Sequence, residues 1–265
     1  MKYVSLTFDD GRKDNYTHAF PIMREYGIKG TLFCTTGYID GTWTKPETWH
    51  SAGEPICIDE MKELRDAGWE IALHGDQHTT DVDDFQIASK KLAKWGFSER
   101  PIGFSVPNSN VSQAKLDELI DHAFGSELAY IRMGRNINTR SISPKVLFAL
   151  YTYCHMQWAF NRFNQHSLMT RENFNQKLIY SIVVRREDDP SMILRFLEKA
   201  QDGTYAVLML HSILPKDDAL YGTDAWCWDA KRFETLCDGL KKMEMQGEAR
   251  YVTVTEMASK TGESK

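Results

Sequence analysis

The chain has 265 residues, which is enough for one large α/β domain or two small ones. Its net charge of −5 at pH 7 gives no electrostatic basis for binding nucleic acid or an anionic membrane surface. Apolar residues make up 42% of the sequence, and no apolar run is long enough to span a bilayer. We therefore expect neither a nucleic-acid partner nor stable membrane insertion. The composition leaves the oligomeric state open.

The N-terminus and the cysteines bear on the compartment. Met1 is followed almost directly by a strand-like run, and no signal peptide is visible. We expect a cytoplasmic protein, or a secreted one if a leader preceded this sequence. The five cysteines are scattered and odd in number, and no Cys-x-x-Cys occurs, so neither a disulfide framework nor a thiolate metal site is expected.

Strand-like and helix-like runs alternate along the chain. The predicted strands are 3–8, 30–34, 69–73, 103–106, 130–133, 179–184, 205–210 and 250–254. The predicted helices are 16–26, 58–67, 83–94, 113–122, 192–200 and 231–246. This order predicts a parallel sheet with helical crossovers, in a single α/β domain spanning residues 1–265. A series of about seven strands favours a (β/α) barrel, whose chemistry lies at the C-terminal ends of the strands.

Two segments interrupt the alternation. Residues 38–57 and 151–178 are predicted as loop insertions, and both are rich in aromatic residues. Long loops in compact domains are often functional, and flat aromatic rings suit the faces of sugars. The sequence leaves open whether residues 38–57 form a lid.

Two adjacent carboxylates, Asp9 and Asp10, follow the first predicted strand and precede Gly11. Like charges side by side cost free energy unless a cation lies between them or one of them holds a proton. The pair therefore indicates a metal site or an acid–base pair, although Asp-Gly is also a common turn signal.

Three histidines follow other predicted strands. His74 and His78 are spaced i, i+4 after the strand at 69–73, and His211 closes the strand at 205–210. Two imidazoles and one carboxylate suit a divalent transition metal. Zinc metalloproteases with the same histidine spacing carry a glutamate directly after the first histidine, and Gly75 in that place excludes them.

Three motifs in this order resemble those of a known family. They are Thr7-Phe8-Asp9-Asp10-Gly11, the stretch 68–78 ending in His78, and the Leu-Met-Leu-His strand end at 208–211. Together with the closing stretch 247–257, they resemble the polysaccharide deacetylase family, also called the NodB-homology or carbohydrate esterase family 4 domain. The resemblance implies a distorted, NodB-like (β/α) barrel. It also implies a metal-dependent hydrolase, a linear amide deacetylase that removes an N-acetyl or related acyl group from a sugar or glycan.

The resemblance also implies roles for individual residues. Asp10, His74 and His78 would bind a divalent metal, most often Zn²⁺, with Co²⁺, Ni²⁺ or Fe²⁺ as alternatives. Asp9 would be the general base, and His211 the general acid that protonates the leaving amine. A metal that activates water and a histidine that donates a proton near neutral pH form a sound mechanism in themselves.

The third and fourth motifs depart from the family pattern. The third motif normally has an arginine that pairs with the base aspartate, before a proline and an aromatic residue. Ser105 stands in the place of this arginine and Asn108 in that of the aromatic residue. Four arginines are candidates to replace it: Arg132, Arg135, Arg185 and Arg186.

The fourth motif normally supplies residues that orient the acid histidine. The candidate carboxylate partners of His211 are Glu187, Asp188 and Asp189. The candidate substrate-binding residues are Ser105, Pro107, Asn108, Trp43 and Trp226.

Other functions remain as alternatives. Distant relatives of the family hydrolyse formamides or cyclic amides, and the altered third motif is also compatible with a catalytically impaired carbohydrate-binding homologue. The presence of Asp9 and His211 argues against the impaired homologue, because binding alone needs neither. Two histidines and a carboxylate also occur in non-haem iron oxygenases, but that site normally lies in a β-sandwich, which the alternating α/β pattern disfavours.

Overall fold

The computed structural model describes residues 1–43, 53–136, 142–223 and 225–262. Its main sheet has the order β5-β4-β3-β2-β1-β8-β6, with β11 also beside β1 and β7 also beside β8. β6 runs antiparallel to β8, whereas the other pairs are parallel. The strands are β1 (Lys2–Phe8), β2 (Gly30–Cys34), β3 (Glu70–Leu73), β4 (Ile102–Ser105), β5 (Leu128–Arg132), β6 (Met169–Thr170), β7 (Ile182–Val183), β8 (Thr204–Leu210) and β11 (Ala249–Tyr251). A separate parallel pair is formed by β9 (Ser212–Leu214) and β10 (Cys227–Asp229).

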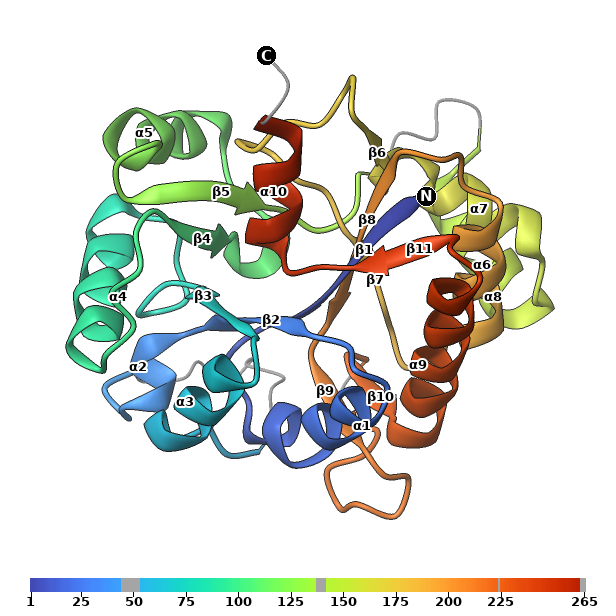
Figure 1. The fold of residues 1–265 in the computed structure, drawn as a ribbon, viewed down its shortest axis with the longest axis horizontal. Coiled ribbons are helices and arrows are strands. Elements are labelled where there is room, and N and C mark those ends of the chain that lie inside the picture. The colour runs from blue at the N-terminus through green and yellow to red at the C-terminus, as the bar shows by residue number, and fades with distance from the viewer. Residues whose placement is uncertain (44–52, 137–141, 224, 263–265) are drawn as a thin grey trace.

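The sheet curls so that its β5 edge approaches β7 near Ile179. The backbone N–H groups of Ile131 and Met133, at the end of β5, donate to Gln176 and Ile179, just before β7. β7 in turn pairs with β8, so the segment from residue 176 to β7 connects both sides of the sheet. The predicted distorted (β/α) barrel of parallel strands is confirmed (Figure 1).

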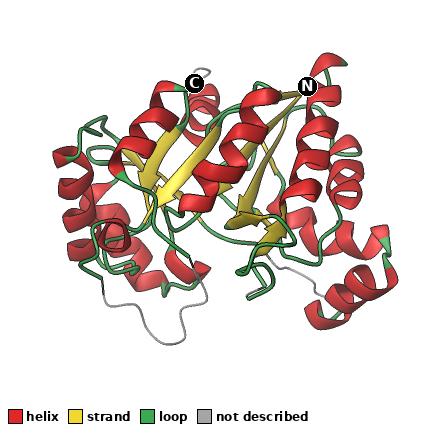
Figure 2. Cartoon of the chain, turned by 90° about the horizontal axis from the view of Figure 1, so that it is seen from below, coloured by secondary structure: helices red, strands yellow, loops and turns green. Residues whose placement is uncertain are grey.

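Helices surround the strands, which occupy the centre of the molecule (Figure 2). Several helices begin at polar caps: Ser112, Asp189 and Asp229 accept hydrogen bonds from the first-turn N–H groups of α5, α8 and α9. The helical segments are η1 (Asn15–Ala19), α1 (Phe20–Glu25), α2 (Thr36–Ile39), α3 (Ile58–Asp66), α4 (Val82–Lys94), η2 (Pro107–Ser109), α5 (Gln113–Ala123), α6 (Pro144–Cys154), α7 (Gln157–Asn164), η3 (Gln165–Ser167), α8 (Pro190–Glu198), α9 (Ala230–Met245) and α10 (Val254–Gly262).

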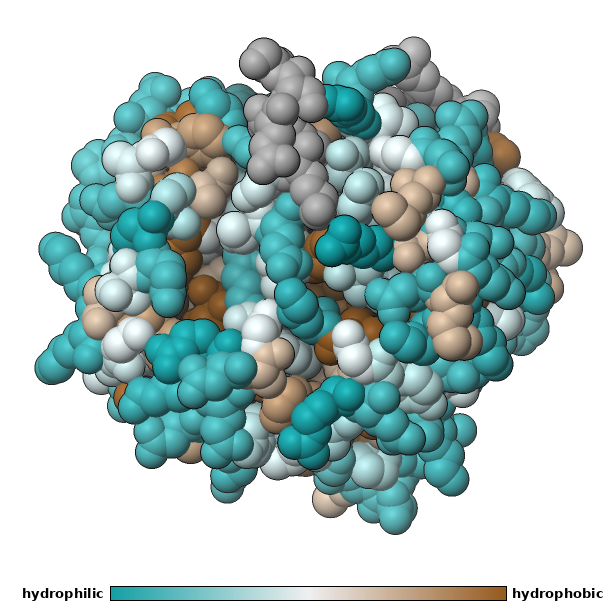
Figure 3. Space-filling view, viewed as in Figure 1, coloured by the Kyte–Doolittle hydropathy of each residue, from teal (hydrophilic) through white to brown (hydrophobic). Residues whose placement is uncertain are grey.

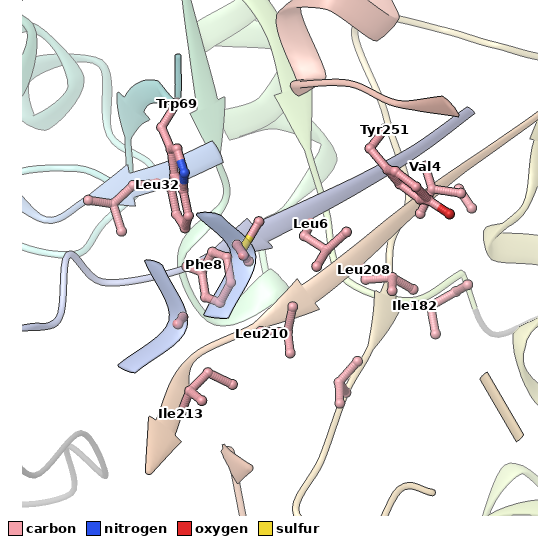
Figure 4. Close-up of a cluster of buried hydrophobic side chains, with 14 of the residues drawn as sticks. Val4, Leu6, Phe8, Leu32, Trp69, Ile182, Leu208, Leu210, Ile213 and Tyr251 are labelled. Carbon is pink, nitrogen blue, oxygen red and sulfur yellow. The ribbon is translucent and has the colours of Figure 1, made fainter. Parts of the chain in front are cut away.

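Two hydrophobic clusters line the two faces of the curled sheet. The larger cluster packs the outer face against the helices, and Figure 4 shows part of it, including Leu6, Phe8 and Leu208. The smaller cluster contains Phe33, Tyr130, Tyr205 and Val207 from the inner face, together with Met257 and Ala258 of α10. Because successive side chains of a strand point to opposite faces, β8 alternates between the two clusters along residues 205–208.

Two predicted segments differ from the structure, and a third is described only in part. The strand predicted at 250–254 ends at Tyr251, because Thr253 and Glu256 form a reciprocal capping box that starts α10. The predicted loop insertion at 151–178 contains the end of α6, then α7, η3 and β6, and its aromatic rings Tyr151 and Phe160 pack edge to face. Residues 44–52 of the predicted loop at 38–57 lie outside the described residues.

The surface gives one further observation on membranes. Hydrophilic residues dominate the face seen in Figure 3, where hydrophobic residues lie mostly in recesses. Among the described residues, no helix combines the length and the apolar character needed to cross a membrane.

Candidate active site

The candidate site lies at the C-terminal ends of the parallel strands. On β8, Tyr205 and Val207 belong to the inner cluster, and two steps of the same alternation lead to His211. On β5, the inward Tyr130 leads in the same way to Arg132, and on β3 the inward Ala72 leads to His74. Gly103 of β4 leaves room for this packing, since a Cβ there would lie 2.1 Å from the Tyr130 ring.

Asp10, His74 and His78 bring three potential metal ligands together. Asp10 Oδ1 lies 3.5 Å from His74 Nε2 and 3.7 Å from His78 Nε2, and the three ligand atoms lie within 4.8 Å of one another. Asp10 and His78 both have the left-handed backbone conformation, with φ of 79° and 56°. Such conformations are costly for residues other than glycine and often occur at functional sites.

The turn between the two histidines is fixed by Asp84 of α4. Its carboxylate accepts hydrogen bonds from the backbone N–H groups of Asp76, Gln77 and Thr79. A Cβ at Gly75 would lie 2.4 Å from this carboxylate, so glycine is needed there. Asp84 was not predicted from the sequence, where it is one of two aspartates at the start of a predicted helix.

Burial favours the neutral form of both imidazoles, and a hydrogen bond orients His74. His74 Nδ1 lies 2.8 Å from the carbonyl oxygen of Ser105, so Nδ1 carries the proton and Nε2 has a free lone pair. Burial lowers the pKa of His74, and burial together with His74 lowers the pKa of His78 to about 2. The donor set of two neutral nitrogens and one carboxylate oxygen therefore fits a divalent transition metal.

Asp9 has two different oxygen environments. Its Oδ1 accepts a hydrogen bond from Arg132 Nη2, whereas Oδ2 has no hydrogen-bond donor among the described residues. Oδ2 lies 3.9 Å from His74 Nε2 and 4.0 Å from His211 Nε2. Burial alone would raise the pKa of Asp9, but the charge and the hydrogen bond of Arg132 hold this pKa below its usual value.

Arg132 is the arginine that pairs with Asp9. It lies on β5 directly opposite Ser105 of β4 in the parallel register, is fully buried, and places its guanidinium 4.8 Å from the Phe33 ring. The other three candidates are placed differently. Arg135 donates to Asn164 and Val183, Arg186 donates to Gly222 and Glu187, and Arg185 lies over the Phe148 and Trp226 rings.

The predicted carboxylate partners of His211 are wrong. Glu187 pairs with Arg186, Asp188 accepts a hydrogen bond from the backbone N–H of Arg185, and Asp189 caps α8. His211 Nδ1 has no hydrogen-bond partner within the described part of the chain. Burial lowers the pKa of His211 to about 4.

Residues after the first motif hold the His211 strand end, a role that no sequence pattern indicates. Asn15 Nδ2 donates to the His211 carbonyl oxygen at 2.6 Å. Asp14 accepts hydrogen bonds from the backbone N–H of Ile213 and, at 2.7 Å, from Arg12 Nη2. Burial raises the pKa of Asp14 despite the nearby Arg12.

The predicted substrate-binding residues divide into three groups. The ring of Trp43 lies 5.6 Å from that of His78, and the ring of Trp226 lies 5.2 Å from that of His211, so the two tryptophans flank the site. Pro107 and Asn108 join His78 in lining a cavity of about 390 Å³. Ser105 is fully buried and contacts His74 through its carbonyl oxygen.

Comparisons with known proteins bear on the family and the fold. The family model for polysaccharide deacetylase matches residues 1–124. YxkH of Bacillus subtilis (strain 168), which is named after the same family, is 35% identical over 122 residues. This match covers 43% of the present chain and 40% of the relative, so the chain corresponds to less than half of that protein.

Solved structures resemble the chain over nearly its whole length. The Xyl-CE4 domain of a multidomain xylanase from the hindgut metagenome of Trinervitermes trinervoides has a TM-score of 0.52 and 15% identity, covering 98% of this chain and 91% of that one. A family 4 acetyl xylan esterase from Clostridium thermocellum, solved with a cobalt ion, has a TM-score of 0.51 and 15% identity, covering 98% and 92%. At this identity the likeness concerns the fold. The resemblance seen in the motifs is thus confirmed: residues 1–124 match the family model for polysaccharide deacetylase, and the chain has the barrel fold of carbohydrate esterase family 4 structures.

Proposed function

We propose that the protein is a metal-dependent hydrolase that removes an N-acetyl or related acyl group from a sugar or glycan. One observation carries the proposal: Asp9 Oδ2 lies at similar distances from a residue of the candidate metal site and from the candidate acid, 3.9 Å from His74 Nε2 and 4.0 Å from His211 Nε2. A water beside Asp9 Oδ2 would lie close to a carboxylate base and to a histidine. A purely structural ion pair would not need the free carboxylate oxygen.

Asp10, His74 and His78 are proposed to hold the metal, as Zn²⁺ or alternatively Co²⁺, Ni²⁺ or Fe²⁺. The support is their donor set and the hydrogen bond that leaves His74 Nε2 without a proton. When bound, a divalent metal would lower the pKa of water and polarise the acyl carbonyl. The cobalt ion bound by the Clostridium thermocellum esterase is consistent with such a centre.

Asp9 is proposed as the general base and Arg132 as its positioning residue. Arg132 holds one carboxylate oxygen and favours the ionised form, so the second oxygen is available to take a proton from the attacking water. Because both side chains are fully or almost fully buried, their attraction is screened little by solvent.

His211 is proposed to protonate the leaving amine. Its pKa of about 4 means that the resting imidazole is neutral, so the proton it donates has to arrive during turnover. Asp9, which takes one proton from water, lies 4.0 Å away and is the proposed source. In this account, water adds to the acyl carbon, the C–N bond breaks, and the proton passes to the amine nitrogen through His211 Nε2.

Trp43 and Trp226 are proposed to bind faces of the sugar on the two sides of the metal site. Pro107 and Asn108 are proposed to contact a neighbouring part of the glycan in the cavity that His78 also lines. A deformylase or cyclic-amide hydrolase would use the same core residues, so the nature of the acyl group is a matter for the assay.

The test is release of acetate from N-acetylated sugars and oligosaccharides, measured on metal-loaded protein before and after chelation. Formylated and cyclic-amide compounds serve as parallel substrates. We expect acetate release that chelation abolishes and added metal restores. The proposal fails if metal-loaded protein, with metal content verified, hydrolyses none of these compounds. It also fails if hydrolysis is the same with and without chelator.

A further inference from the structure

A cationic cluster lies beside the candidate acid, and the proposed mechanism does not use it. Arg185 follows β7 at the carboxyl end of the barrel, just as His211 follows β8, and the two strands are neighbours. The Arg185 guanidinium lies 4.9 Å from the centre of the Trp226 ring, which itself lies 5.2 Å from the His211 ring. The Trp226 ring therefore contacts both the Arg185 guanidinium and the candidate acid His211.

Within the described part of the chain, the Arg185 guanidinium is held in place by aromatic rings and not by an anionic partner. It lies over two aromatic rings, with Phe148 at 5.0 Å and Trp226 at 4.9 Å, which fixes its plane. Among the described residues, no carboxylate forms an ion pair with it, and its Nε is buried without a hydrogen-bond acceptor. An arginine held flat in this way is well prepared for bidentate binding of a carboxylate or phosphate.

The charges around Arg185 leave a positive excess. Arg186 and Glu187 pair with each other, at 3.4 Å. The Asp188 carboxylate interacts with the charges of two guanidiniums, those of Arg135 and Arg185. One oxygen of Asp188 accepts the backbone N–H of Arg185, and the other is buried with no hydrogen-bond partner among the residues the structure describes, so neither oxygen pairs with the Arg185 guanidinium there.

We propose that Arg185 binds an anionic group of the substrate, a carboxylate or phosphate that lies about one sugar ring from the acylated amine. Trp226 would pack against that ring between the anion and His211. This inference rests on the proposed function, because it defines the class of sugar that the same site accepts. A neutral sugar would offer no opposite charge to the Arg185 guanidinium.

The activity arm compares three N-acetylated substrates: N-acetylglucosamine, its 1-phosphate and N-acetylmuramic acid. We expect metal-loaded wild-type protein to prefer at least one anionic substrate, and Arg185→Gln to reduce that preference about 10- to 100-fold, mainly through KM. Arg185→Lys keeps the charge but not the fork, and should restore part of the preference. The phosphate and carboxylate arms show which anion is recognised.

Arg186→Gln is the matched control, because it removes the adjacent cation from the same turn while leaving Arg185 in place. It should keep the preference for the anionic substrate. Equal kcat/KM for all three substrates in the wild type would overturn the inference, as would an equal loss on neutral and anionic substrates in Arg185→Gln.

A binding arm separates this inference from the proposed function. Calorimetric titration of metal-loaded protein with inorganic phosphate and with glucuronate is compared between wild type, Arg185→Gln and Arg186→Gln. We expect a binding event for at least one anion that only Arg185→Gln loses. If no substrate is hydrolysed but this event is present, the proposed function fails and the anion site stands. If the two variants bind both anions like the wild type, the anion site fails.

Discussion

Ser105 and Arg132 lie directly opposite each other on the neighbouring strands β4 and β5. The family pattern expects an arginine at the Ser105 position, and the structure provides one from the next strand at the same level. The guanidinium of Arg132 reaches Asp9, and both Arg132 and Ser105 are fully buried. The ion pair of the candidate base is thus kept although its positive partner comes from a different element.

Exchanging these two residues tests the arrangement. Arg132→Ser removes the cation beside the buried Asp9 carboxylate, so kcat should fall by about 10²- to 10³-fold. The pKa of Asp9 should rise, so the acidic limb of the kcat/KM profile should move to higher pH. The double variant Ser105→Arg/Arg132→Ser should recover part of both effects. The measurement is a pH–rate profile of each variant with metal content verified.

Arg132→Lys provides the control, since it keeps the charge but loses the planar fork, and should fall between the wild type and Arg132→Ser. If Arg132→Ser retains wild-type kcat and an unshifted acidic limb while its thermal unfolding is cooperative, Arg132 has no positioning role.

The sequence predicted the barrel well because its signals are local. Short-range periodicity predicts the alternating strands and helices. The residues Asp9, His74 and His211 directly follow predicted strands, and the structure places these strand ends at one end of the barrel. The link between Arg132 and Asp9 is different. It depends on the register between β4 and β5, and no pattern within either strand specifies that register.

Two predictions differ from the structure because of interactions that a single sequence does not reveal. The helices in residues 151–178 are stabilised by aromatic packing such as that of Tyr151 on Phe160, which a single sequence does not reveal. The carboxylates at 187–189 were predicted to contact His211 because of their place in the chain. Local hydrogen bonds direct Asp188 to the Arg185 backbone and Asp189 to the start of α8 instead.

Substitution of Asp9 and Asp10 should separate metal binding from proton transfer. Asp10→Ala removes a candidate ligand, so we expect loss of bound metal and activity together. Asp9→Asn keeps the shape and removes the base, so metal content should stay near the wild-type level while kcat falls by about 10²- to 10⁴-fold. Metal analysis after desalting and acetate-release kinetics on the same samples give both readouts. A fully active Asp9→Asn would contradict the assigned role.

Metal removal should lower thermal stability. A ligand that binds only the folded state stabilises it by about 2.7 kcal/mol when its free concentration is one hundred times its Kd. Unfolding monitored by circular dichroism should therefore show a higher Tm with Zn²⁺ than with chelator, and the difference should vanish in Asp10→Ala. A Tm difference that persists unchanged in Asp10→Ala and in His78→Ala would place the stabilising metal elsewhere.

The pH dependence of stability should carry a contribution from Asp188. Burial raises the pKa of Asp188 to about 6, against the partly opposing Arg185 backbone N–H and the Arg135 and Arg185 charges, and Glu187 raises it further. The folded state therefore binds a proton that the unfolded state has already lost between about pH 4 and pH 6. Ionisation of this group lowers the free energy of unfolding as pH rises through that window, by about 1.4 kcal/mol for each unit by which the pKa is raised.

Asp188→Asn removes this effect, so its stability relative to the wild type should rise between pH 4 and pH 6 and level off above. Asp189→Asn is the matched control with the opposite sign. Burial acts to raise the pKa of Asp189, but the hydrogen bonds from Ser191 outweigh it and hold the pKa below the usual value. Asp189→Asn should therefore be destabilised near neutral pH, by an amount that shrinks as pH falls below 4. Urea unfolding of the three proteins in phosphate-free buffers measures both differences, and parallel pH curves for Asp188→Asn and the wild type would show that Asp188 titrates normally.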